Sequence, residues 1–73
     1  MPTGSQLLHL TINGETRTFE DVPDVAALVA ALGLDTKKVA VERNLEIVPR
    51  STIGEVAVED GDRFEFVTFV GGG

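Results

Sequence analysis

The order of apolar and polar residues predicts an α+β fold, with one main helix packed across one face of a mixed sheet of four to five strands. Three observations lead to this fold class. The chain opens with two β-prone runs that are separated by a strong turn signal. An alanine-rich amphipathic helix follows. A longer β-prone run with three of the four phenylalanines then precedes the C-terminal glycines.

The first two strands are predicted to form a hairpin. Apolar and polar residues alternate from Leu8 to Ile12, as in a half-buried strand, and Glu15 to Phe19 returns as its partner. Asn13-Gly14 between them favours a type I′ turn, because both residues tolerate positive φ. His9 lies on the polar side of the first strand, where we expect an exposed side chain without a catalytic role.

The main helix is predicted to begin at Val25, with Asp24 as its N-cap. Gly33 fits the C′ position that follows the end of a helix. Apolar residues at spacings of three and four form one stripe, which consists of Val25, Leu28, Val29 and Leu32. We expect this stripe to cover the sheet.

Two short strands are predicted in the middle of the chain. The first is Val39 to Val41, which runs towards Asn44, and the second is Ile47-Val48, after a turn at Leu45-Glu46. Pro49 has no N–H to donate to a neighbouring strand, so it should end the second strand at an edge of the sheet.

A helical turn and an acidic turn are predicted next. Ser51 should cap a single helical turn that extends to Glu55, with Ile53 and Val56 as its apolar anchors. Glu59-Asp60-Gly61-Asp62 has three carboxylates, but it lacks the ligand spacing and the closing glutamate of an EF-hand calcium loop. We interpret it as a turn and predict no metal site.

The run from Arg63 to Val70 is predicted to be the central strand. Phe64 and Phe66 share one face, and Val67 and Phe69 share the other. A single helix covers only one of these faces. Val67 and Phe69 therefore either form an exposed partner-docking face or lie under the small helical turn or the N-terminal lead-in.

These elements predict a particular topology. The first and last strands can lie side by side in the centre of the sheet, with the chain wrapped round the helix, which is the β-grasp or ubiquitin-like architecture. We expect a single domain over residues 1–73, with a loose lead-in over 1–6 and a flexible glycine tail over 71–73.

Composition argues against several classes of function. The net charge of −6 is unsuited to a nucleic-acid partner, which requires a basic surface. The chain has no cysteine and one histidine, so disulfides and zinc or thiolate metal sites are not expected. No apolar run has the length of a membrane span, and the first residues do not resemble a signal peptide. We expect a soluble cytoplasmic protein that contacts no membrane.

The three terminal glycines, Gly71, Gly72 and Gly73, carry the main functional hypothesis. Glycine lacks a Cβ atom, so this tail is thin. The α-carboxylate of Gly73 is a group that can serve as an acyl donor without any side chain. We expect this carboxylate to be the reactive group, and we expect the folded part of the chain to present it to other enzymes. The alternative is that the glycines are a spacer, since many chain ends are disordered.

Three segments resemble the ThiS-type sulfur carriers of thiamine biosynthesis. They are the sequence VERNLEIVPR over residues 41–50, the sequence DGD over 60–62, and the sequence VTFVGGG over 67–73. The resemblance extends from about Leu8 to the end of the chain. The lead-in over residues 1–6 departs from it, because members of the family usually begin at the first strand.

This resemblance implies a carrier without catalytic residues, bound cofactor or metal. A partner related to ubiquitin-activating enzymes, an adenylyltransferase, would use ATP to adenylate Gly73. A persulfide from a sulfurtransferase or cysteine desulfurase would then convert Gly73 to a thiocarboxylate, and thiazole synthase would take the sulfur for thiazole formation. Gly71 and Gly72 would let the tail thread into partner active sites, from which water is excluded.

Several alternatives to this function stay open. One is the small subunit of molybdopterin synthase, another β-grasp sulfur carrier that ends in two glycines, although the ERN and IVPR segments favour the thiamine branch. A sulfur carrier of tRNA thiolation or cysteine synthesis is a second. A ubiquitin-like protein modifier would instead be joined to lysines through Gly73. An RNA-binding β-grasp module would not need the glycines, but the acidic charge argues against it.

Overall fold

The computed structural model of the chain describes residues 7–69. In it, β1 (Leu7–Ile12) pairs antiparallel with β2 (Glu15–Glu20), which is the predicted hairpin. Asn13 and Gly14 have φ angles of 50° and 87°. The predicted type I′ turn is confirmed, because both of its central residues require positive φ.

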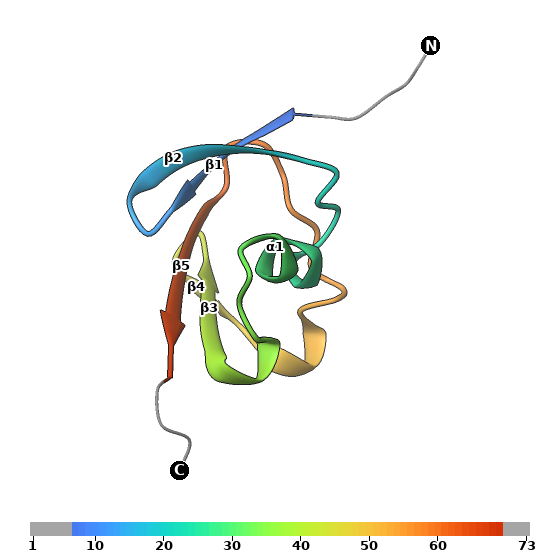
Figure 1. Cartoon of the computed structure of the whole chain (residues 1–73), viewed down its shortest axis with the longest axis vertical. Coiled ribbons are helices and arrows are strands. Elements are labelled where there is room, and N and C mark those ends of the chain that lie inside the picture. Colours follow the sequence, from blue (N-terminus) through green and yellow to red (C-terminus); the bar gives the residue numbers. More distant parts are fainter. Residues whose placement is uncertain (1–6, 70–73) are drawn as a thin grey trace.

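The five strands form one mixed sheet in the order β2-β1-β5-β3-β4. The remaining strands are β3 (Val39–Arg43), β4 (Glu46–Val48) and β5 (Arg63–Thr68). β5 occupies the centre, parallel to β1 and antiparallel to β3 (Figure 1). The predicted β-grasp topology is therefore confirmed, with the first and last strands side by side.

The side chain of Asn13 extends the central parallel pair beyond the end of β1. Its Oδ1 atom accepts a hydrogen bond from the backbone N–H of Phe66 at 2.7 Å, and its Nδ2 atom donates to the carbonyl of Phe66 at 3.2 Å. The backbone N–H of Asn13 also donates to the carbonyl of Phe64 at 2.9 Å. The amide side chain thus makes the bonds that another strand residue would make.

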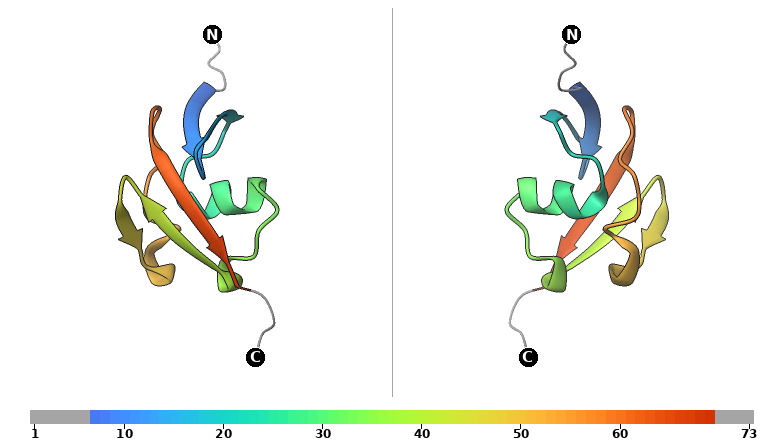
Figure 2. Two further views of the ribbon diagram at one scale, coloured as in Figure 1. Left: turned by 90° about the vertical axis from the view of Figure 1, so that its left-hand side faces the viewer. Right: turned by 90° about the vertical axis from the view of Figure 1, so that its right-hand side faces the viewer.

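The helix α1 (Val25–Ala31) crosses one face of the sheet, and among residues 7–69 no helix covers the opposite face (Figure 2). The carboxylate of Asp24 accepts a hydrogen bond from the N–H of Ala27 at 2.8 Å, which confirms the predicted N-cap. Gly33 follows the helix with a φ of 75°. No helix among residues 7–69 is both long and apolar enough to cross a bilayer.

The hydrophobic core lies between α1 and the sheet. The five most completely buried large side chains are those of Val25, Leu28, Val29, Leu10 and Phe64. Ile53 and Val56 also pack against this core, as predicted. β4 ends at Val48 on an edge of the sheet, directly before Pro49.

Two turn predictions are wrong in detail. The β3–β4 turn consists of Asn44 and Leu45, with φ angles of 52° and 73°, because Glu46 already pairs with Arg43. The predicted helical turn is a 3-10 helix, η2 (Arg50–Thr52), which has no side-chain cap. Ser51 lies inside it and caps nothing, because Pro49, with φ fixed near the helical value, stands at the N-cap position.

Candidate functional site

The candidate site begins where β5 leaves the sheet. Val39 pairs with Thr68, and the N–H of Phe69 donates to the carbonyl of Lys38 at 2.8 Å. The chain is therefore held in place through Thr68, the last residue of β5, and on to Phe69. Gly71, Gly72 and Gly73, which are predicted to carry the chemistry, lie outside the described residues.

An apolar patch lies on the open face of the sheet, directly before the tail. Val67 and Phe69 are 57% and 54% exposed, and the exposed Ala40 pairs with Val67. Among residues 7–69, neither the helical turn nor any other element buries them. We call Ala40, Val67 and Phe69 the tail-side patch.

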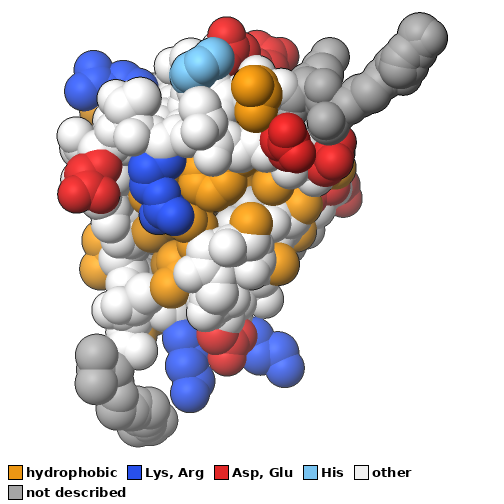
Figure 3. Space-filling view, turned by 45° about the horizontal axis from the view of Figure 1, so that its top comes forward, with side chains coloured by type: hydrophobic (Ala, Val, Ile, Leu, Met, Phe, Trp, Pro, Cys, Tyr) orange, Lys and Arg blue, Asp and Glu red, His pale blue; other side chains and the backbone are white. Residues whose placement is uncertain are grey.

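Basic side chains stand at the same end of the molecule. The short 3-10 helix η1 (Thr36–Lys38) carries the exposed Lys37 and Lys38, and the carbonyl of Lys38 binds Phe69. In Figure 3 basic side chains project from this lower end with an acidic side chain between them, and the histidine lies towards the upper end, where acidic and basic side chains both occur. In a chain with a net charge of −6, Lys37 and Lys38 thus place positive charge beside the end of β5, with Asp35 next to them.

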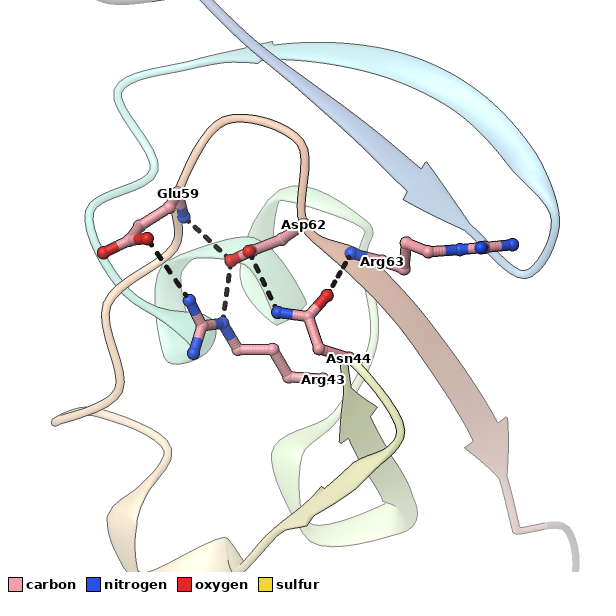
Figure 4. Close-up of polar contacts among 5 residues, drawn as sticks. All are labelled: Arg43, Asn44, Glu59, Asp62 and Arg63. Atoms are coloured by element: carbon pink, nitrogen blue, oxygen red, sulfur yellow. Dashed lines mark hydrogen bonds and ion pairs between the residues drawn. The ribbon is translucent and has the colours of Figure 1, made fainter.

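A polar network centred on Asp62 joins two of the segments that resemble sulfur carriers (Figure 4). Asp62 is only 6% exposed. Its Oδ2 atom accepts hydrogen bonds from Arg43 Nε at 2.7 Å and from the N–H of Glu59 at 2.9 Å. Its Oδ1 atom accepts from Asn44 Nδ2 at 3.1 Å. Asp62 thus ties the acidic turn to the end of β3.

Asn44 connects this network to the first residue of β5. Its Oδ1 atom accepts a hydrogen bond from the N–H of Arg63 at 3.0 Å, and its own N–H donates to the carbonyl of Arg63 at 2.8 Å. Arg43 also lies 3.8 Å from the carboxylate of Glu59. The β3–β4 turn, the acidic turn and the start of β5 are consequently held as one unit.

Hydrogen bonds lower the pKa of Asp62. Burial alone would raise it, but the bonds from Arg43, from the N–H of Glu59 and from Asn44 outweigh burial and hold the pKa below its ordinary value of 3.8. A carboxylate with a lowered pKa in the folded state stabilises the fold above its unfolded-state pKa, and this stabilisation is lost as the pH falls through the folded-state value.

This pKa shift predicts how the stability of an Asp62→Asn variant depends on pH. We expect the difference in unfolding free energy between the wild type and the variant to be complete at neutral pH. It should shrink as the pH falls from about 5 towards about 2, because protonated Asp62 no longer accepts the same bonds. Urea denaturation across this pH range measures the difference. A difference that stays constant into acid would contradict the assigned role of the carboxylate.

His9 is exposed, as predicted, and is paired with the acidic turn. Its side chain is 62% exposed, and its Nδ1 atom lies 3.2 Å from Oδ1 of Asp60. The backbone N–H of His9 donates to the same oxygen at 2.7 Å. These two bonds, the backbone one first, hold the pKa of Asp60 below its ordinary value. The predicted turn at residues 59–62 is thereby fastened to β1 as well.

Sequence reasoning did not identify the roles of Arg43, Asn44 and Asp62. The sequence shows only that the positively charged Arg43 follows one predicted strand and that the negatively charged Asp62 precedes another. Such a signal becomes informative only once the strands are known to be neighbours. The sequence also gave no indication that Leu45 would be 90% exposed.

Comparisons with known proteins agree on one family. The model of the ThiS family matches residues 10–73. A sulfur carrier protein ThiS from Bacillus subtilis is 40% identical over 65 residues, which cover 88% of this chain and 98% of that protein. A crystal structure of a thiamine biosynthesis protein (ThiS) from Geobacter metallireducens has a TM-score of 0.77 at 36% identity, over 90% of this chain and 100% of that one.

Longer proteins also contain a segment similar to this chain. A thiazole synthase from Paramagnetospirillum magneticum is 58% identical over 66 residues, and one from Magnetococcus marinus is 39% identical over 66 residues. In both cases the match covers 90% of this chain. The chain spans only 20% of the length of each of these relatives.

Proposed function

We propose a function from the premise that this chain belongs to the ThiS family, which its match over residues 10–73 establishes. The family assigns the chain to the sulfur carriers of thiamine biosynthesis. We infer that the carboxylate of Gly73 is first adenylated and then converted to a thiocarboxylate, which donates its sulfur for thiazole formation.

The chemistry acts on the terminal carboxylate alone. One oxygen of the Gly73 carboxylate attacks the α-phosphorus of ATP, and pyrophosphate leaves. The outer sulfur of a partner's persulfide then attacks the acyl carbon and displaces AMP. A thiol of a partner then attacks the cysteine sulfur of the resulting acyl disulfide, the S–S bond breaks, a disulfide forms between the two partner sulfurs, and the carrier leaves as a thiocarboxylate. An adenylyltransferase, a sulfurtransferase or cysteine desulfurase, and a thiazole synthase are the partners that this sequence of steps requires.

The observation that supports this proposal is the rigid attachment of β5 up to Phe69. The bond from Phe69 to Lys38 fixes the point from which the final residues start, so their reach into a partner is set by their own length. Gly71 and Gly72 lack side chains that would collide with the walls of a narrow active site. The folded domain then contributes position and recognition, and the partners contribute the catalytic groups.

We propose the tail-side patch as the surface that the activating partner grips. Exposed apolar side chains of this kind mark protein interaction sites, and Val67 and Phe69 immediately precede the tail. Binding there would place the tail at the partner's active site.

Replacing both apolar side chains by threonine should weaken binding to the activating enzyme. The double variant Val67→Thr/Phe69→Thr keeps β-prone residues in the strand, so its melting temperature should change little. Its dissociation constant, measured by calorimetry, should rise by about tenfold or more, because central apolar side chains dominate such interfaces. Thr18→Ser, a change at an exposed position of β2, should leave the affinity unchanged. Wild-type affinity in the double variant would rule out this surface.

The test of the proposed function is intact mass spectrometry after incubation with ATP, the activating enzyme and a sulfur source. The mass should increase by the difference between one sulfur atom and one oxygen atom, and fragmentation should place the change at Gly73. A ladder of conjugates to other proteins, without a thiocarboxylate, would instead identify a protein modifier.

A further inference from the structure

The β3–β4 turn presents two exposed apolar side chains at the end of the open face away from the tail. Leu45 is 90% exposed and Ile47 is 76% exposed, more than the other large apolar side chains among residues 7–69. Val67 and Phe69 belong to the opposite end of the same face, near the point where β5 ends. We call Leu45 and Ile47 the turn-side anchor.

Leucine is a poor residue for the backbone conformation at position 45. Its φ of 73° is left-handed, a region in which side chains with a Cβ atom are strained and which glycine and asparagine tolerate best. Asparagine at position 45 would therefore be at least as compatible with this backbone conformation as leucine. Leu45 contributes neither core burial nor turn geometry, so its apolar side chain calls for a different explanation.

The base of this turn is held firmly. Asn44, directly before Leu45, is bound through its side chain to Asp62 and to the N–H of Arg63. Arg43 is bound to Asp62 as well. The backbone of a turn on such a base loses little conformational freedom when a partner binds, so only the side-chain rotamers have to be ordered, which favours affinity.

Two carboxylates lie between the turn-side anchor and the tail-side patch. Glu42 and Glu65 are directly opposite each other in the pairing of β3 with β5, and Ile47 is opposite Glu42 on the other side. Like charges in this arrangement repel. Both glutamates, together with Leu45 and Arg63, line a hollow of about 330 Å³. Arg63 brings one positive charge to this hollow against the two carboxylates, and a cationic side chain of a partner would balance the second.

The two carboxylates and the exposed apolar side chains favour one kind of partner over another. A second copy of this chain would bring the same two carboxylates and a further net charge of −6, which opposes association. A partner with Lys or Arg beside an apolar recess complements both the glutamates and the anchor. The surface therefore fits a basic protein surface and not a symmetric dimer.

We propose that the turn-side anchor docks into thiazole synthase, with Glu42 and Glu65 paired to its cationic side chains. This inference rests on the proposed function. The choice of partner follows from the thiazole synthases that contain a segment up to 58% identical to this chain within a protein of five times its length. A carrier joined to its synthase meets it at an effective concentration of about millimolar, so a small additional anchor is enough to fix its orientation.

The substitution Leu45→Asn separates docking from folding. Asparagine suits the left-handed backbone, so the melting temperature of the variant should equal or exceed that of the wild type. Its dissociation constant for the thiazole synthase of the source organism, measured by calorimetry with the full chain, should be about tenfold higher. Leu7→Asn makes the same chemical change at another exposed leucine, the first residue of β1, and should keep wild-type affinity.

The two carboxylates are tested with the double variant Glu42→Gln/Glu65→Gln. Removing the repulsion should leave the fold as stable as the wild type or more so. Binding to thiazole synthase should weaken and lose part of its dependence on salt concentration. Glu15→Gln, on the hairpin edge, removes an exposed charge from outside this face and should have no such effect.

The outcomes of these tests discriminate between the two proposals. Equal affinity of Leu45→Asn and wild type for thiazole synthase would overturn the anchor. A loss of affinity only for the activating enzyme would overturn the choice of partner. Mass spectrometry of both proteins with the activating enzyme is independent of the anchor, and both should gain sulfur equally. Failure of the wild type to gain sulfur would count against the proposed function itself.

Discussion

Removal of Gly72 and Gly73 should abolish sulfur loading and leave the fold intact. Without them the terminal carboxylate is withdrawn by roughly 7 Å, since an extended residue spans about 3.5 Å, and the activating enzyme would have no acyl group in reach. The hydrogen bonds of β5 that the structure describes end at Phe69, so the melting temperature should shift by less than about 2 °C. Mass spectrometry and thermal denaturation measure the two effects on one sample.

The control for this deletion removes two residues from the opposite end of the chain. Deleting Pro2 and Thr3, which lie outside the region matched by the family model, should change neither loading nor stability. A complementary variant adds one uncleavable residue after Gly73, which moves the carboxylate outward by about 3.5 Å. Sulfur loading of this extended variant would refute the assignment of the chemistry to Gly73.

The substitution Asp62→Asn should destabilise the fold by about 2 to 3 kcal/mol at neutral pH, since hydrogen bonds to a charged group are of this strength. The variant loses the charge that partners Arg43, and its amide nitrogen cannot accept the bonds that Oδ2 receives. The side chain of Arg43 remains 25% exposed, so water compensates for part of the loss, and the larger effect of a fully buried pair is not expected. Thermal denaturation should show a melting temperature lowered by roughly 8 to 24 °C.

A matched control shows whether this effect belongs to the network. Glu55→Gln neutralises an exposed carboxylate elsewhere in the chain and should change stability by less than about 0.5 kcal/mol. A double-mutant cycle of Asp62→Asn with Arg43→Gln should reveal coupling, because the two side chains are in direct contact. Additive effects of the two substitutions would contradict the network in Figure 4.

The elements that the sequence predicted well are those whose signals are local. The turn at Asn13-Gly14 depends on two adjacent residues that accept positive φ, and the cap at Asp24 depends on the carboxylate reaching an N–H three residues ahead. The alternation of Phe64 and Phe66 with exposed neighbours follows from the geometry of any strand. Family resemblance then supplied the functional hypothesis, and the comparisons confirm the family.

The features that escaped prediction depend on contacts between distant segments. The β3–β4 turn falls at Asn44 and Leu45 because Asn44 is bound to Asp62 and Arg63, which lie 18 and 19 positions further along the chain. No local propensity favours leucine at a φ of 73°. The exposure of Val67 and Phe69 likewise depended on where the small helical turn packs, and the sequence leaves that position open.

The pairing of β5 with β1 also determines when the domain can form during protein synthesis. Asn13 and Phe66, which bind each other directly, are 53 positions apart. Nearly this whole sequence must therefore be translated and emerge from the ribosome before β5 can enter the sheet. Until then the hairpin and α1 lack the apolar side chains of β5 against which they pack. The carrier thus acquires its shape in a late step after its C-terminal strand emerges, and cannot build it gradually as the polypeptide grows.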